Sequence, residues 1–452
     1  MIIKIPPKAA AILETLEKAG FEAYVVGGCV RDAILGRIPD DWDITTSAAP
    51  EQVKALFRRT VDTGLQHGTV TVMMEKEGFE VTTYRVDGDY EDGRHPREVT
   101  FTASLEEDLK RRDFTINAMA YNPKEGLVDL FGGLHDIQEK IIRCVGNPLD
   151  RFTEDALRIM RAVRFSAQLG FEIEPETWKA LGILGPNLKH VSAERIQVEL
   201  VKLLISPHPD YFRKAYESGI TKEFLPEWDA CMETSQNTPH HCYTVGEHIL
   251  KSLSLVRSDK VLRLTMLLHD IGKPVVKTTD ENGRDHFKMH GPRGEEMAKK
   301  ILRRLKFDND TIARVCHLIK WHDFRPLPEM KAVRRAVNQI GEDAFSMYLE
   351  VQRADMLAQS LYRRQEKEER LKGVETCWKT IQENHQCVSL KTLAVTGKDL
   401  IQAGMAPGKE LGEALKILLE IVLEDPERNT RECLLGILEE NRERWKNGCT
   451  AP

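Results

Sequence analysis

Two aspartates one residue apart, Asp41 and Asp43, stand near the end of VVGGCVRDAILGRIPDDWDITT, residues 25–46. The segment WDITT has the composition of a short strand, and alternate side chains of a strand point to the same face. The two carboxylates then lie together and repel each other unless a cation sits between them. Such oxygen ligands suit Mg²⁺, and a pair of these ions can hold a triphosphate while activating an attacking hydroxyl group.

Gly27 and Gly28 precede these aspartates, at the end of an apolar run typical of a strand. Glycines let the backbone approach phosphate groups closely and leave amides free in a turn before a helix. Arg31 follows within reach of the same oxygens. The segment therefore predicts a site for a nucleoside triphosphate.

A second polar pattern occupies EDALRIMRAVRF, residues 154–165. Spacings of three predict a helix whose polar stripe contains Asp155, Arg158, Arg161 and Arg164. An amphipathic helix with ordinary ion pairs is the simpler explanation when the pattern is taken alone. The alternative is base recognition, because cytosine and adenine present an amino donor beside a ring-nitrogen acceptor, whereas guanine and uracil reverse that order. A carboxylate beside a guanidinium group would accept C and A.

Composition limits the class of protein. The chain has 452 residues, 41% apolar and 30% charged, which predicts two to four globular domains. Its formal charge of −6 argues against nonspecific coating of nucleic acid. The sequence has no apolar run long enough to span a bilayer and no Cys-x-x-Cys pair among its nine cysteines, so we expect a cytoplasmic protein with reduced thiols.

Residues 1–145 alternate between helix and strand patterns, and amphipathic helices follow from about residue 146 to the end. Strands are expected in EAYVV, WDITT, GTVTVMME and FEVTTYR. Helices are expected in ILETLEKAG, PEQVKALF and RRDFTINAMAY.

The combination GG-x-x-R-D followed by D-x-D-x-x-T resembles the nucleotidyltransferase superfamily that includes DNA polymerase β. Within it, the chain resembles the class II tRNA nucleotidyltransferases, which are the CCA-adding enzymes and the bacterial poly(A) polymerases. Further segments are similar to the family's flexible loop, second signature, base-reading motif and neck motif. They are residues 80–101, RRDFTINAMA (111–120), EDALRIMRAVRF and ERIQVEL (194–200).

This resemblance implies roles for individual residues. Gly28, Arg31 and Arg112 would bind the nucleotide, Asp41 and Asp43 would bind Mg²⁺, and Glu80 is a candidate third carboxylate. The alternative for Glu80 is an exposed strand residue without a role in the site. Asp155 and Arg158 would read the base, with Arg161 and Arg164 beside them. The implied substrates are CTP, ATP and tRNA.

Histidines concentrate between residues 240 and 322. His269 and Asp270 end an apolar helical segment, with His248 before them and Asp355 well after them, which resembles the HD phosphohydrolase superfamily. The resemblance implies that these four residues bind one divalent metal, and their mixed ligand set suits Mn, Ni, Mg, Fe or Co. His290 and His322 would complete a second metal site or bind phosphate. A 2′,3′-cyclic or 3′ phosphate at an RNA end is the expected substrate.

The expected fold is α+β, with a polymerase-β-like head (1–145) followed by a helical neck (146–210), an HD domain (211–365) and a helical tail that binds tRNA (366–452). Alternatives within the same family are a poly(A) polymerase and an enzyme that adds only A. From another class, the HD domain would be the main enzyme, a nucleotide phosphohydrolase beside an RNA-binding head.

Overall fold

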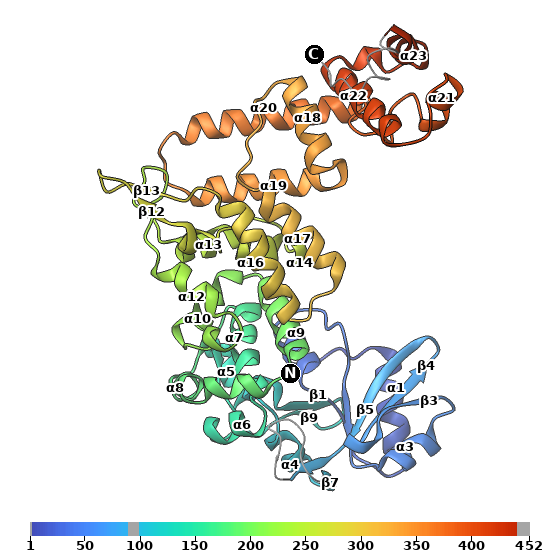
Figure 1. Ribbon diagram of the computed structural model, residues 1–452. Coiled ribbons are helices and arrows are strands. Elements are labelled where there is room, and N and C mark those ends of the chain that lie inside the picture. Colours follow the sequence, from blue (N-terminus) through green and yellow to red (C-terminus); the bar gives the residue numbers. More distant parts are fainter. Residues whose placement is uncertain (1, 89–98, 441–452) are drawn as a thin grey trace. The chain divides into compact units, whose positions relative to one another are not determined.

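The structure, a computed structural model, describes residues 2–88 and 99–440 (Figure 1). The chain divides into two compact units: Met1–Asp229 with Arg304–Phe307, and Ala230–Arg303 with Asp308–Pro452. The division into four domains stays a prediction. Most of the segment DGDYEDGRHP, compared above with the flexible loop, lies outside the described residues. No helix in the described ranges is both long and apolar enough to cross a membrane.

A mixed seven-stranded sheet organises the first unit, in the order β3-β4-β5-β2-β1-β8-β9. Its strands are β1 (Ala23–Val26), β2 (Ile44–Thr46), β3 (Thr60–Gly64), β4 (Thr69–Met74), β5 (Glu77–Thr83), β8 (Met119–Asn122) and β9 (Gly126–Asp129). The helices α1 (Pro7–Lys18), α2 (Gly28–Ile34), α3 (Pro50–Leu56) and α4 (Leu105–Lys110) accompany them, and β6 (Arg85–Asp87) pairs with β7 (Val99–Phe101). This arrangement confirms the expected polymerase-β-like head.

The register at the centre of the sheet positions the acidic residues. β2 and β5 are parallel, with Ile44 opposite Val81. The amide of Val26 donates to the carbonyl of Asp43 at 3.0 Å, which extends the pairing of β1 and β2 by one residue. Asp43 and Glu80 each precede this pair by one residue. They are therefore neighbours on adjacent segments of the sheet, with their side chains on the same face.

The core beside these strands is apolar and aromatic. A cluster of buried side chains joins β1, β8, α4 and the end of β5: Tyr24, Val26, Tyr84, Leu109 and Ala120. The rest of the first unit is mainly helical. It contains α5 (Gly133–Glu139), α6 (Pro148–Glu154), α7 (Leu157–Leu169), α8 (Pro175–Leu184), α9 (Ala193–Leu204), α10 (Phe212–Glu217), α11 (Thr221–Phe224) and most of α12 (Pro226–Glu233).

The structure corrects three sequence-based expectations. The segment RRDFTINAMAY is not a helix, since it forms a 3₁₀ turn (Thr115–Asn117) and then β8. All four residues of β8 are buried, and a strand buried on both faces has no alternation to distinguish it from a helix. β2 begins at Ile44, so Asp41 and Asp43 lie just before the strand. Short strand pairs also occur after residue 146, because β11 (Glu172–Ile173) joins β10 (Ile141–Ile142), and β12 (Thr278–Thr279) pairs with β13 (Asp285–His286).

Over its described residues, the second unit is helical apart from the β12–β13 hairpin (Figure 1). Four helices, α13, α14, α17 and α19, pack against one another at its centre. The helices are α13 (Val245–Leu253), α14 (Lys260–Leu268), α15 (Lys273–Val276), α16 (His290–Arg304), α17 (Asn309–Trp321), α18 (Met330–Ile340), α19 (Glu342–Ala358), α20 (Arg364–Glu383), α21 (Gly397–Gln402), α22 (Lys409–Glu424) and α23 (Arg431–Glu440).

Candidate active site and candidate metal centre

Three carboxylates, which we call the carboxylate cluster, gather at the start of β2 and on β5: Asp41, Asp43 and Glu80. All three residues are exposed, and none has an ion pair with another described residue. Burial of its carboxyl raises the pKa of Asp43, and the charges of Glu80 and Asp41 raise it further, against the opposing charge of Arg112. The side chain of Asp43 is thus solvent-accessible yet lies in a hollow surrounded by protein atoms.

The donor set of the carboxylate cluster fits Mg²⁺. It offers only hard carboxylate oxygens, which this ion prefers. Repulsion from Glu80 and Asp41 contributes to the raised pKa of Asp43, and a bound cation would reduce this repulsion. The geometry therefore brings together Asp41, Asp43 and Glu80, the three head carboxylates that the sequence singled out.

Arg112 lies beside Gly27, directly before α2. Gly27 has φ 81° and ψ −127°, a backbone conformation that favours glycine. A Cβ atom at this position would lie 2.9 Å from Nη1 of Arg112. The fully buried carboxylate of Asp108 lies 3.4 Å from the other terminal nitrogen of Arg112 and also bonds Arg111 at 2.7 Å. Gly27 thus leaves the space that the guanidinium group of Arg112 occupies.

Arg31, on α2, is buried and held on several sides. Its guanidinium group donates to the side-chain oxygen of Asn117 at 2.6 Å and to both carboxylate oxygens of Asp32 at 2.9 Å. Its charged end also lies 5.1 Å from the ring centre of Phe165. Gly28, at the start of α2, places its backbone beside Arg31, since a Cβ atom there would lie 3.7 Å from the guanidinium group.

The arginines of α7 each face a carboxylate. Arg158 bonds Glu154, Arg161 bonds Asp113 at 2.6 Å, and Arg164 bonds Glu199 at 2.8 Å. Arg158 and Arg164 are buried, so the expected exposed polar stripe is partly internal. The opposite face is buried as expected, through Ala156, Ile159, Met160 and Val163.

Asp155 lies between α6 and α7 and not on the helix itself, because its backbone is extended. Its carboxylate accepts from the amide of Leu157 at 3.0 Å and from both terminal nitrogens of Arg195, at 3.2 and 2.7 Å. A carboxylate has about four lone-pair sites, so one acceptor position is left for a ligand.

The second unit brings six further predicted residues together in what we call the histidine cluster: His248, His269, Asp270, His290, His322 and Asp355. All six are buried. The Nε2 atoms of His248 and His269 lie 3.2 Å apart, and that of His248 lies 3.0 Å from Oδ1 of Asp355. Oδ2 of Asp270 lies 3.5 Å from His248 Nε2 and 3.3 Å from His269 Nε2.

Asp270 also faces the other histidine pair. Its Oδ1 atom lies 3.6 Å from Nε2 of both His290 and His322, and these two nitrogens lie 3.0 Å apart. Each carboxylate oxygen of Asp270 therefore faces one of the two histidine pairs. The cluster contains two groups with the geometry of metal ligands, and Asp270 belongs to both. The first group is His248, His269 and Asp270, and the second is Asp270, His290 and His322.

The backbone fixes the protonation of these imidazoles. The Nδ1 atom of each histidine lies near a carbonyl oxygen, at 3.3 Å in His248, 2.9 Å in His269, 2.8 Å in His290 and 2.6 Å in His322. A carbonyl can only accept, so Nδ1 carries the proton and the lone pair of Nε2 points inward. Two such lone pairs about 3 Å apart repel each other, and a divalent metal between them removes the repulsion. The ligand set therefore fits a metal centre.

Charges around the histidine cluster keep its carboxylates ionised. Burial would raise the pKa of Asp270, but the ammonium charge of Lys273 beside it holds that pKa well below its usual range. The ammonium group of Lys273 lies 2.7 Å from Oδ2 of Asp270. Both oxygens of Asp270 are buried without a hydrogen bond of good geometry, which is expected for ligands that a metal would take up.

Several residues at these sites escaped the sequence analysis. Asp113 and Asn117 lie in the quoted motif RRDFTINAMA, in which only Arg112 was given a role, and they anchor Arg161 and Arg31. Lys273 lies in the segment LRLTMLLHDIGKP (262–274), three residues after Asp270, but its contact with Asp270 depends on the turn between α14 and α15. Arg195 and Glu199 lie in the neck motif, and only the fold shows that they face α7.

Comparisons with known proteins agree with this architecture. The family description "Poly A polymerase head domain" matches residues 23–143, a polymerase RNA-binding region matches residues 170–232, and domain 2 of tRNA nucleotidyltransferases matches residues 290–438. The chain is 36% identical to a CCA-adding enzyme of Lactobacillus helveticus over 96% of both chains. It is 38% identical to that of Levilactobacillus brevis over 90% of this chain and 91% of the relative.

Among solved structures, the chain is similar to the Bacillus stearothermophilus CCA-adding enzyme in complex with CTP, at 31% identity and a TM-score of 0.73. The match covers 98% of this chain and all of the other. The Thermotoga maritima CCA-adding enzyme complexed with tRNA shares the fold, at 22% identity and a TM-score of 0.60, over 97% of this chain and all of the other.

The space that Gly27 leaves for Arg112 is testable with a matched pair of variants. Gly27→Ala should lower the free energy of unfolding by about 1 to 3 kcal/mol, because alanine resists this backbone conformation. It should also weaken nucleoside triphosphate binding, because the new methyl group displaces Arg112. Gly20→Ala is the control, since Gly20 has φ 89° but no atom within 4 Å of an added Cβ. Urea unfolding and calorimetric titration measure both effects, and equal triphosphate binding by the two variants would refute this role of Gly27.

Proposed function

We propose that this chain, which belongs to the family of the CCA-adding enzymes, adds C, C and A to the 3′ end of tRNA from CTP and ATP without a template strand. The observation that carries the proposal is the carboxylate cluster, whose three acidic groups have no ion pair with another described residue. Among them, Asp43 lies within the electrostatic influence of Arg112. Relatives named for CCA addition match nearly the whole chain, which favours this activity over polyadenylation.

The reaction is a phosphoryl transfer. The 3′-hydroxyl oxygen of the RNA forms a bond to the α-phosphorus of the nucleotide, the bond to the β-phosphate breaks, and pyrophosphate leaves. Asp41 and Asp43, with Glu80 as a third ligand, would hold Mg²⁺. When bound there, Mg²⁺ lowers the pKa of the attacking hydroxyl group and neutralises charge on the leaving group.

Positively charged groups would orient the triphosphate in this reaction. Arg112 is the cation whose charge acts on Asp43, so it would be suited to hold a phosphate group of the nucleotide near the carboxylate cluster. Arg31 and the backbone at Gly28 lie beside one another and are the next candidates. Arg161 and Arg164, which are tied to Asp113 and Glu199, would support this surface and hold Phe165 against Arg31.

Selection of C and A is assigned to Asp155 and Arg158. The acceptor position left on Asp155 would take the amino group of cytosine or adenine, and Arg158 would donate to the adjacent ring nitrogen. Arg195 and Glu154 hold these two side chains in place. This arrangement would reject guanine and uracil, whose donors and acceptors are reversed.

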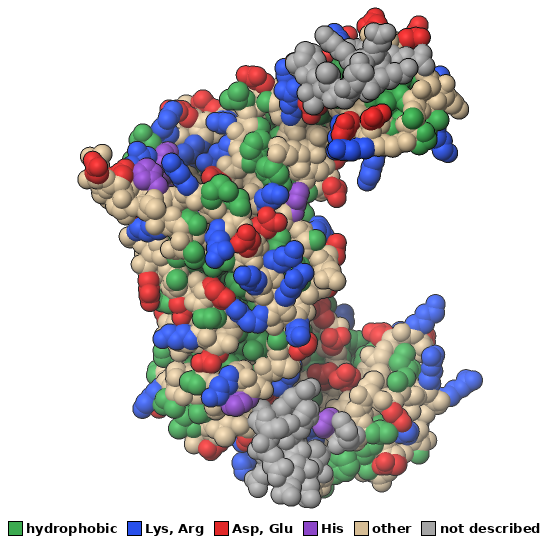
Figure 2. All heavy atoms as spheres, in the orientation of Figure 1, with side chains coloured by type: hydrophobic (Ala, Val, Ile, Leu, Met, Phe, Trp, Pro, Cys, Tyr) green, Lys and Arg blue, Asp and Glu red, His purple; other side chains and the backbone are tan. Residues whose placement is uncertain are grey.

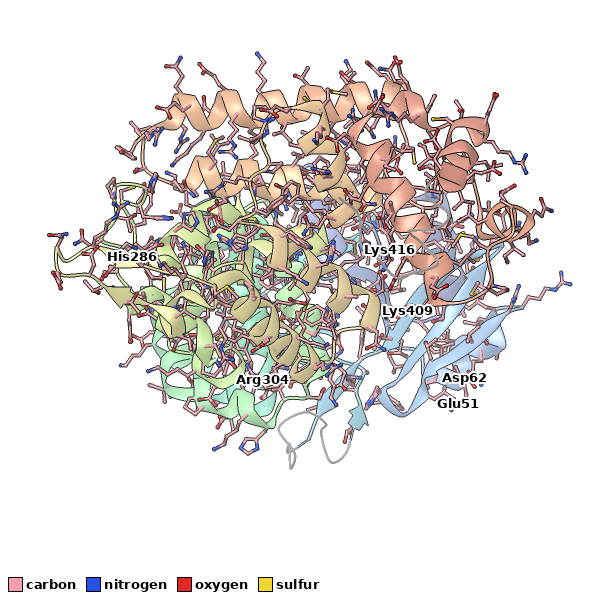
Figure 3. The ribbon with its side chains drawn as sticks, turned by 45° about the horizontal axis from the view of Figure 1, so that its top comes forward. Glu51, Asp62, His286, Arg304, Lys409 and Lys416 are labelled. Atoms are coloured by element: carbon pink, nitrogen blue, oxygen red, sulfur yellow. The ribbon has the colours of Figure 1, made fainter. Side chains whose placement is uncertain are left out.

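The helical tail is the proposed contact for tRNA beyond its 3′ end. Lys409 and Lys416 extend from α22 (Figure 3). Lys409 is 91% exposed and lies 3.6 Å from Glu413, so its charge is only weakly compensated and is available to a phosphate backbone.

Removing the charge of Asp43 from the carboxylate cluster should raise stability but lower activity. A carboxyl whose pKa is raised by folding destabilises the folded state once pH exceeds its unfolded pKa, so the cost is fully present at neutral pH. Asp43→Asn should therefore raise the Tm slightly in Mg²⁺-free buffer at pH 7 and lose this gain at pH 3. The same variant should lower the rate of nucleotide addition by at least about a hundredfold.

The control for this variant is Asp62→Asn on β3 (Figure 3), because Asp62 pairs with Lys54 at 2.8 Å. It should keep its activity and gain no stability. Near wild-type addition by Asp43→Asn, or by Asp41→Ala, would remove the basis of the mechanism.

Base selection is tested with four separate nucleotides. tRNA transcripts that end at the discriminator base, or already carry CC, are incubated with each nucleoside triphosphate alone. Replacing Asp155 and Arg158 together by alanine should relax the choice of base more than it lowers the total rate. Glu176→Gln, which changes an acidic residue in the first turn of α8, is a control that should leave selection unchanged. Unaltered rejection of GTP and UTP by the double variant contradicts the assignment.

A second function, metal-dependent phosphoesterase activity, is favoured by the histidine cluster. Its four inward Nε2 atoms and two carboxylates would bind a divalent metal such as Mn, Ni, Mg, Fe or Co. A metal bound there would polarise a water molecule and a phosphoryl oxygen. Attack of water on a 2′,3′-cyclic phosphate would form a new P–O bond and break the bond from phosphorus to the 3′ oxygen, with a proton of the water transferred to that oxygen. The products would be a 2′-phosphate and a free 3′-hydroxyl group at the RNA end, ready for extension.

This activity is tested with the full chain and a 2′,3′-cyclic nucleotide in the presence of each of the five metals in turn. At least one metal should support hydrolysis, and Asp270→Asn should lower the rate by about a hundredfold or more because both metal groups lose a shared carboxylate. Asp43→Asn should hydrolyse normally, since it alters only the first unit. Absence of hydrolysis with every metal would leave the histidine cluster without this function.

A further inference from the structure

A cavity of about 230 Å³ lies within the second unit, between α19, α20 and the segment that follows α17. Its rim carries four cationic side chains and one carboxylate, Glu366. The cations are Arg325, Arg363, Lys367 and Arg370. Its floor is apolar and includes Tyr348, Leu349, Met356 and Leu371. Figure 2 shows Lys, Arg and His side chains gathered in this part of the molecule, around the start of α20 and the β12–β13 hairpin.

The positive charge of this rim is only partly neutralised, because Arg325 pairs with Asp355 and Asp323 and Arg363 pairs with Glu366. The one carboxylate, Glu366, is taken by Arg363 at 2.7 Å. In residues 2–88 and 99–440, neither Lys367 nor Arg370 has a carboxylate partner: Lys367 donates to Oε1 of Gln359 at 2.8 Å, and Arg370 donates to backbone carbonyls. Burial, and then the charge of Arg325, lowers the pKa of Lys367. Cations crowded into a partly enclosed space attract an anion.

The cavity adjoins the histidine cluster through Asp355. Oδ1 of Asp355 lies 3.0 Å from Nε2 of His248, on the side of the histidine cluster. Its Oδ2 accepts from Arg325 at 3.0 Å, and the amide group of Gln359 lies 3.0 and 3.1 Å from its two oxygens. Arg325 and Gln359 both line the cavity. One carboxylate therefore separates the cationic cavity from the candidate metal centre.

We propose that this cavity binds one nucleoside phosphate unit, with Lys367 and its neighbouring arginines on the phosphate and the apolar floor against the sugar and base. The proposal deepens the phosphoesterase function proposed above, but binding itself requires no metal. The volume is below the range of about 300–1,000 Å³ typical of small-molecule pockets, so the cavity is too small to enclose a run of RNA. A phosphate group suits the exposed and half-buried cations of the rim, and a sugar or base ring suits the buried side chain of Tyr348.

The test measures binding of adenosine 3′-monophosphate to the full chain in EDTA. Calorimetry gives the affinity, and hydrogen exchange followed by mass spectrometry gives the location, which separates this cavity from the first unit. We expect protection in peptides from α19 and α20. Lys367→Gln should weaken this binding about tenfold, and Lys367→Arg should retain it.

The matched control is Lys379→Gln, also on α20, because Lys379 is 76% exposed and lies outside the cavity. It should bind as the unchanged chain does. The proposal is overturned if α19 and α20 show no protection, if Lys367→Gln binds normally, or if adenosine without phosphate binds equally well. If adenosine 3′-monophosphate binds in EDTA but no metal supports hydrolysis, the proposed phosphoesterase function is refuted, whereas the assignment of the cavity as a binding site is retained.

Two further ligands distinguish the source of the nucleotide. A short RNA with a 3′-phosphate that binds more tightly than adenosine 3′-monophosphate, with the same dependence on Lys367, assigns the cavity to RNA ends. A mononucleotide that binds at least as tightly as the RNA assigns it to free nucleotides. Inorganic phosphate should bind more weakly than either, because it leaves the apolar floor exposed, and equal binding by phosphate would contradict a nucleoside site.

Discussion

Repulsion among the carboxylates of Asp41, Asp43 and Glu80 is the constraint on which the first unit depends. The parallel pairing of β2 and β5 brings Asp43 beside Glu80, and no ion pair within the described chain compensates them. A fold optimised only for stability would not retain this arrangement, because ionised like charges in a hollow raise the free energy of the folded state. The arrangement becomes favourable when a cation and the triphosphate that accompanies it are bound.

The second unit uses a similar principle with neutral groups. Backbone carbonyls fix the proton of each imidazole on Nδ1, so the Nε2 lone pairs of His248 and His269 face each other, as do those of His290 and His322. Both units therefore place electron-rich atoms close to one another. The cavity beside the histidine cluster is the complementary case, since Lys367 and Arg370 there provide positive charge that an anion would neutralise.

Local patterns in the sequence predicted the acidic motif and the helical character of the chain from about residue 146, because these features depend on residues close together in the chain. The ligand set His248, His269, Asp270 and Asp355 was implied by resemblance to a family, and the structure brings these distant residues together. Partners of the α7 arginines were not predictable in this way. Arg161 bonds Asp113, 48 positions away, and Arg164 bonds Glu199, 35 positions away. The sequence analysis assigned β8 to a helix because a strand buried on both faces lacks alternation of apolar and polar residues. The space that Gly27 leaves for Arg112 depends on a contact between residues 85 positions apart, which only the fold reveals.

The most direct measurement of the central claim is a titration of the full chain with Mn²⁺ in place of Mg²⁺, with and without CTP, followed by electron paramagnetic resonance. We predict a class of Mn²⁺ that binds only with CTP, that persists when Asp270 is changed to Asn and that disappears when Asp43 is changed to Asn. CTP-dependent Mn²⁺ binding of equal strength and number in the chain altered at Asp43 would contradict the account.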